Sequence, residues 1–121
     1  MFLKYLKDCD EFIAGDGSIL REFLHPDKAN LKINYSLAYA KVTVGQATKP
    51  HKLRASEVYY ILVGQGLMHI NEHSFQVNPH CAIYIPPHSK QYIENIGESD
   101  LEFLCIVEPA WREEYEQIFE R

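Results

Sequence analysis

Hydrophobic and polar residues alternate along most of this chain in short runs, and turn-forming residues separate the runs. Between residues 31 and 44, alternate positions carry Ile33, Tyr35 and Leu37, while mostly small residues fill the other parity. Such period-two alternation predicts half-buried β-strands. Similar short runs continue to the apolar stretch LEFLCIV at 101–107. Short strands separated by frequent turns predict an all-β fold made of packed sheets or a barrel.

Glycines and a change of period mark the two elements that depart from simple strands. The GQG at 64–66 interrupts an apolar run, so we expect a β-hairpin over 58–70. After Pro109 the apolar residues take helical spacing, which predicts a short amphipathic C-terminal helix over 110–120. The AGDGS segment at 14–18 is predicted to be a turn and nothing more.

These boundaries divide one predicted domain, residues 1–121, into three parts. We expect N-terminal strands over 1–35, a core barrel over about 36–109 and the helix over 110–120. The aromatic N-terminal segment and the helix with Trp111 both offer apolar surface, and they predict a homodimer.

Composition narrows the expected partners and location. The chain has 17 Asp and Glu against 12 Lys and Arg, a formal net charge of -5. Nucleic acid and anionic membrane surfaces require clustered cations, so neither is expected as a partner. No apolar run approaches the ~18 residues of a membrane span, and no leading signal-type segment is present, so we expect a cytoplasmic protein. The three cysteines form no CxxC pair, and Cys105 is predicted to be a reduced core residue.

The candidate chemistry lies between residues 45 and 64. His51, Glu57 and Tyr59 share parity, so neighbouring strands would turn all three toward one interior. An imidazole and a carboxylate in an apolar wall are the beginning of a transition-metal site. The alternative is a hydrogen-bonded pair in a metal-free cavity, because a buried carboxylate needs a partner. Tyr59 is a candidate ligand-binding residue, since its hydroxyl can bond a bound oxygen.

The spacing in this segment resembles the first motif of the cupin superfamily, carried here by Gly45, His51, Leu53, Glu57 and Gly64. Residues 79–95 resemble the second motif more loosely. The resemblance implies a double-stranded β-helix, that is, a jelly-roll cupin barrel. It also implies metal ligands at His51 and Glu57. Two positions where the family usually has histidine hold Leu53 and Gln91, so the implied ligand set is His51, Glu57 and Gln91, with the amide the weakest donor.

A divalent transition metal (Zn, Fe, Mn, Ni or Cu) is the cofactor that the resemblance implies. One carboxylate and two neutral ligands would leave about one net positive charge, which favours an anionic ligand. The implied function is binding of a small molecule by a metal-dependent isomerase or oxygenase. The alternative is a non-catalytic binding or sensing module whose metal site is weakened or absent. His80 and His88 lie in turns where cupins usually have glycine, and we expect both to point outward.

Overall fold

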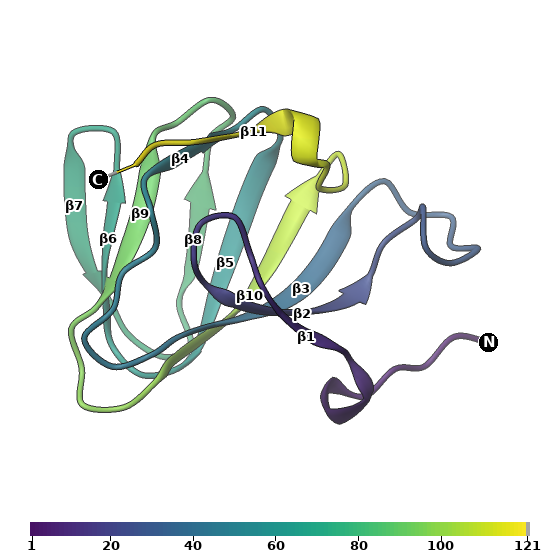
Figure 1. Cartoon of the computed structure of the whole chain (residues 1–121), viewed down its shortest axis with the longest axis horizontal. Coiled ribbons are helices and arrows are strands. Elements are labelled where there is room, and N and C mark those ends of the chain that lie inside the picture. The colour runs from purple at the N-terminus through teal and green to yellow at the C-terminus, as the bar shows by residue number, and fades with distance from the viewer. Residues whose placement is uncertain (121) are drawn as a thin grey trace.

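The computed structural model describes residues 1–120, which form two antiparallel sheets that face each other (Figure 1). Within that range the larger sheet has the order β1-β2-β3-β10-β5-β8. Its strands are β1 (Glu11–Ile13), β2 (Ile19–Leu24), β3 (Ser36–Val42), β10 (Leu101–Glu108), β5 (Ser56–Val63) and β8 (Ala82–Ile85). The all-β prediction is therefore confirmed.

The smaller sheet has the order β11-β4-β9-β6-β7. Its strands are β11 (Glu116–Ile118), β4 (His51–Leu53), β9 (Gln91–Asn95), β6 (Gly66–Ile70) and β7 (His73–Val77). Two single-turn 3₁₀ helices, η1 (Leu6–Asp8) and η2 (Glu113–Tyr115), complete the elements of residues 1–120. Strand pairing does not join the two sheets into one closed cylinder.

The core lies between the sheets, on the inward-facing parity of each strand. In β10 the buried residues Leu101, Phe103 and Val107 alternate with outward-facing neighbours. Ile61 of β5 and Ile93 of β9 are fully buried in one cluster with Leu101 and Phe103, whereas Val107 belongs to a second, smaller cluster. Burying each such side chain stabilises the fold by roughly 1.5–3 kcal/mol, so the alternation seen in the sequence holds the two sheets together.

The prediction of a C-terminal helix over 110–120 is wrong. Only the 3₁₀ turn of η2 forms, and residues 116–118 then continue as strand β11, which pairs with β4 at Glu116↔Leu53 and Ile118↔His51. An isolated helix of this length is marginal in water. The free edge of β4 instead offers backbone partners to the C-terminal segment, so pairing is the better solution.

The hairpin predicted over 58–70 is also wrong, because β5 and β6 belong to different sheets. The chain crosses between the sheets at Gly64, whose φ of +91° suits glycine. A Cβ on Gly64 would lie 2.6 Å from the Asp100 carbonyl oxygen. Glycine at this position therefore permits a close backbone crossing, which the sequence pattern alone does not distinguish from a tight turn.

Among residues 1–120 there is no helix with the length and apolar character that crossing a membrane would require.

Candidate functional site

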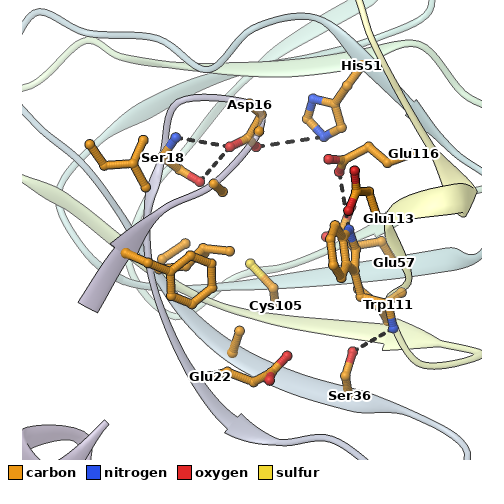
Figure 2. Close-up of a pocket in the computed structure, with 18 of the residues that line it drawn as sticks. Asp16, Ser18, Glu22, Ser36, His51, Glu57, Cys105, Trp111, Glu113 and Glu116 are labelled. Atoms are coloured by element: carbon orange, nitrogen blue, oxygen red, sulfur yellow. Dashed lines mark hydrogen bonds and ion pairs between the residues drawn. The ribbon is translucent and has the colours of Figure 1, made fainter. Parts of the chain in front are cut away.

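A cavity of about 530 Å³ opens between the two sheets. Strands β3, β5 and β10 form its floor, and His51 of β4 lies on the opposite side. Segments from both ends of the chain complete the wall: the turn between β1 and β2, and the residues around Trp111 and Glu116 (Figure 2). This volume is within the range of small-molecule sites, roughly 300–1,000 Å³.

His51 and Glu57 both line this cavity, and both are buried. They do not lie on neighbouring strands as expected, because β4 belongs to the smaller sheet and β5 to the larger one. The two side chains thus approach each other across the space between the sheets. His51 pairs in register with Gln91 of β9, which brings that third predicted residue beside them.

One ring nitrogen of His51 is committed to the backbone. Its Nδ1 lies 2.8 Å from the Lys49 carbonyl oxygen, and because a carbonyl only accepts, Nδ1 carries a proton and donates. In the neutral ring Nε2 is then an acceptor. Nε2 lies 3.9 Å from Asp16 Oδ2, too far for a hydrogen bond, so it remains available to a molecule in the cavity.

Glu57 is held from behind by a short chain of hydrogen bonds. Gln91 Nε2 donates to Glu57 Oε1 at 3.0 Å, and the Tyr59 hydroxyl donates to Gln91 Oε1 at 3.2 Å. No hydrogen bond within residues 1–120 reaches the second oxygen of Glu57. The predicted ligand-binding residue Tyr59 lines the cavity with its ring, which packs against Phe103 at 4.5 Å between centroids, while its hydroxyl is used by Gln91.

Burial raises the pKa of Glu57 from 4.5 to about 7. The nearby His51 ring and the Gln91 hydrogen bond lower this pKa, whereas the carboxylates of Asp16 and Glu116 raise it further. A carboxyl with a pKa near neutrality can both accept and release a proton under physiological conditions. Glu57 thus has the proton affinity that a general acid or base requires.

Two acidic residues that the sequence reasoning missed complete the site. Asp16, read only as part of a turn, reaches in from the β1–β2 hairpin and faces His51 (Figure 2). Ser18 fixes its carboxylate, with the hydroxyl donating at 2.7 Å, and the Lys49 N–H donates to the Asp16 carbonyl at 2.7 Å. Glu116 enters from β11, where the Trp111 indole N–H donates to it at 3.3 Å.

Burial also raises the pKa of Glu116, and the charge of Asp16 raises it further. These acids therefore sense one another's charge inside the cavity. A signal for Asp16 was present in the sequence, since an Asp between two glycines is free to project from a tight turn. The sequence around residues 14–18 did not indicate which part of the protein this turn would contact.

The predicted metal-ligand set His51, Glu57 and Gln91 is brought together, but its donors do not suit a metal. The Gln91 amide nitrogen faces Glu57, and its oxygen already accepts from Tyr59. Leu53, which occupies the place of the family's second histidine, packs with Ala55 and Val107 in an apolar cluster. It offers no metal-binding atom. Among residues 1–120, no three His, Cys, Asp or Glu side chains are placed to share one ion.

The remaining sequence predictions for this region concern a cysteine and two histidines. Cys105 is a free, buried thiol on the cavity floor, as predicted, and burial raises its pKa well above the usual value. It stays protonated and is a poor nucleophile. His80 and His88 are exposed in turns with φ of 71° and 66°, which confirms the prediction that they point outward at glycine-like positions.

Comparison with known proteins places this chain in a family. Residues 38–107 match the Cupin domain family. The chain is 44% identical over 110 residues to an uncharacterized protein of Methanocaldococcus jannaschii, covering 90% of this chain and 87% of that one. It is 32% identical over 88 residues to an oxalate-binding protein of Thermotoga maritima, covering 72% and 68%.

Solved structures agree with this fold. A polyketide cyclase from Streptomyces resistomycificus superposes with a TM-score of 0.76 at 21% identity, over 89% of this chain and 79% of that one. Identity at this level shows the fold alone. The family match, which spans more than half of the sequence, establishes the assignment: this chain belongs to the cupin superfamily.

Proposed function

We propose that this cupin binds a small organic molecule in the cavity between its sheets and exchanges a proton with it through Glu57 and His51. One observation supports this most directly: both residues are buried, yet each turns an atom without a hydrogen-bond partner, Glu57 Oε2 and His51 Nε2, toward the cavity. Among residues 1–120 no fully buried side-chain nitrogen or oxygen lacks a hydrogen-bond partner, so these two atoms are open to the cavity. A ligand is the natural partner for these two.

Proton transfer is the chemistry that these residues support best. Glu57 titrates near pH 7, so it can remove a proton from carbon or oxygen and return it, as isomerisation or dehydration requires. His51 Nε2 can accept a proton from a ligand, and the nearby Asp16 carboxylate, 3.9 Å away, would stabilise the positive charge that the ring then carries. No step is assigned to a metal, because both polar atoms of the Gln91 amide already form hydrogen bonds, one with Glu57 and one with Tyr59. The cavity also supports the non-catalytic binding module as the second candidate.

Binding itself is tested with a neutral probe, 2-phenylethanol, followed by the fluorescence of Trp111, the single tryptophan of the chain and part of the cavity wall. We expect saturable binding that is unchanged after EDTA treatment. Ala38 lines the cavity, and Ala38→Leu should weaken binding about tenfold or more by filling the space. Ala82→Leu, at an exposed site on β8, is the matched control.

Three outcomes of this titration would count against the proposal. If no saturable binding is seen, or if Ala38→Leu binds the probe as tightly as the wild type does, the cavity is not the ligand site. Binding that EDTA abolishes and Zn²⁺ or Mn²⁺ restores, together with stoichiometric metal that His51→Ala loses, would instead support the ligand set that the sequence implied.

We also propose that the chain pairs with a second copy through the outer face of the larger sheet. Register places Leu37, Ile106, Val58 and Tyr84 in one row across β3, β10, β5 and β8. Tyr84 is 63% exposed and Ile106 38% exposed. A continuous apolar sheet face of this kind commonly marks a protein interface.

Light scattering at micromolar concentration should give twice the mass of the chain. Ile106→Lys should shift the protein to a monomer, because a dimer would bury the new charge without a partner. Val44→Lys, which replaces another exposed apolar residue in the turn after β3, should leave the mass unchanged. A monomeric wild-type protein would contradict the proposed pairing.

A further inference from the structure

The charges around the cavity are strongly unequal. Its acidic and basic side chains are five carboxyl groups and one imidazole: Asp16, Glu22, Glu57, Glu113, Glu116 and His51. Of these carboxyl groups, Glu22 is paired with Lys28 outside the cavity wall at 2.5 Å. Within residues 1–120 no lysine or arginine lines it. An oxalate dianion would meet this wall without a cationic partner, and desolvating an unpaired anion beside carboxylates is unfavourable. The anionic ligand expected from a metal site therefore does not fit this cavity.

Hydrogen-bonding capacity points the same way as the charge. Three of the cavity's potential donors are already used within the protein: the Ser18 hydroxyl donates to Asp16, the Trp111 indole N–H to Glu116 and the Tyr59 hydroxyl to Gln91. The atoms left facing the cavity include Glu57 Oε2 and neutral His51 Nε2, which accept. A complementary ligand must bring donors.

Both acceptors are reached only through the cavity, because the rest of each side chain is buried. Glu57 is 7% exposed and His51 2% exposed, so bulk water does not surround them. The acids also raise each other's proton affinity, since the charge of Asp16 contributes to the raised pKa of both Glu57 and Glu116. A cation placed among the acids would relieve this mutual repulsion.

Resting on the proposed small-molecule function, we propose that the ligand is an organic cation with an apolar portion, such as a primary ammonium or an amidinium. The charged end lies among Asp16, Glu57 and Glu116, and its N–H groups donate to one or two of the acceptors left open to the cavity, Glu57 Oε2 and His51 Nε2 among them. The apolar portion packs on the aromatic wall that Phe103 and Trp111 provide. A lone metal ion is a poorer occupant because no three of these groups converge on one point.

The test compares four probes by Trp111 fluorescence at low salt: phenethylamine, which is protonated, its neutral isostere 2-phenylethanol, phenylacetate and oxalate. We expect phenethylamine to bind about tenfold or more tightly than the alcohol, from at least one charge-assisted hydrogen bond. Neither anion should bind at ten times that concentration. Asp16→Asn and Glu116→Gln keep the Ser18 and Trp111 bonds, and each should weaken phenethylamine about tenfold while leaving the alcohol unchanged.

Measuring the affinity for phenethylamine as a function of pH tests whether the charges of the cavity acids, and not only their shapes, contribute to binding. The groups that face Glu57 are His51, Asp16 and Glu116, and both Glu57 and Glu116 have raised pKa values. Raising the pH from about 5.5 to about 8 ionises Glu57, whose pKa is about 7, so affinity for phenethylamine, which stays protonated, should increase. Affinity for the neutral alcohol should stay flat.

Glu98→Gln removes the same charge from an exposed turn outside the cavity and should leave all four affinities unchanged. Equal affinity for amine and alcohol, or preference for either anion, would overturn the cation proposal while leaving the binding function in place. If none of the four probes binds, both the cation proposal and the proposed binding function fail.

Discussion

Replacing Glu57 with glutamine is expected to stabilise the fold at pH 8 by about 3 kcal/mol, because the pKa of Glu57 is raised from 4.5 to about 7 and each unit corresponds to about 1.4 kcal/mol. The folded protein must hold this carboxylate buried at pH 8, whereas the unfolded chain ionises it in water. Glutamine has the same shape and can still accept the hydrogen bond from Gln91, so the variant removes the charge and keeps the contact.

The sign of the pH dependence follows from the direction of this shift. Between about pH 4.5 and pH 7 the folded state binds the Glu57 proton more tightly than the unfolded state, so the Glu57 contribution to stability falls as pH rises through this window. Urea unfolding of wild type and Glu57→Gln across this range should show the two free energies diverging with increasing pH and parallel below it.

Two further measurements define this result. The ¹³C signal of the Glu57 carboxyl should titrate near pH 7 in the wild type. Glu98→Gln, the exposed control, should change the free energy of unfolding by less than about 0.5 kcal/mol at every pH. A Glu57 carboxyl that titrates near 4.5, with no divergence between the two proteins, would contradict the raised proton affinity of Glu57 in the folded protein.

Replacing Gln91 with leucine is expected to destabilise the protein by about 3 kcal/mol at pH 8. Gln91 is 1% exposed and connects Glu57 to Tyr59. Leucine fills a similar volume but leaves a buried carboxylate and a buried hydroxyl without the amide that satisfies both. Urea unfolding measures the loss, and Gln117→Leu on the exposed parity of β11 should change stability by less than about 0.5 kcal/mol.

A double-mutant cycle separates hydrogen bonding from packing. In the Glu57→Gln background the group left unpaired is a neutral amide, which costs less to bury than a carboxylate. The Gln91→Leu substitution should therefore be less destabilising there than in the wild type, giving a coupling energy of about 1 kcal/mol or more. Additive effects of the two substitutions would mean that Gln91 makes no net interaction with the Glu57 charge and acts through packing and its bond to Tyr59.

The site combines a family framework with residues from outside it. Glu57 and His51 lie within residues 38–107, the part that matches the Cupin domain family. Asp16, Glu113 and Glu116 lie outside that range and supply most of the negative charge of the cavity. Under the proposed function, ligand preference depends on the N-terminal hairpin and the C-terminal segment, which line the cavity from opposite ends of the sequence.

Local alternation was enough to predict much of the scaffold. Period two decides which residues of a strand share a face, so the strand content, the buried Cys105 and the shared parity of Glu57 and Tyr59 could be read directly from the sequence. The motif spacing also brought His51 and Gln91 correctly into one neighbourhood. These features depend on residues close together in the chain or on a recognisable pattern.

Long-range packing decided what the sequence by itself could not. The alternation of residues along a strand does not determine which strands pair. We therefore expected β4 and β5 side by side, whereas they belong to separate sheets that face each other. The C-terminal segment became a strand because the edge of β4 was open to it. Asp16 looked like one residue of a turn, and it became part of the site because the Lys49 N–H anchors that turn over the cavity. Contacts between distant segments set the charge of the cavity, and no local pattern encodes them.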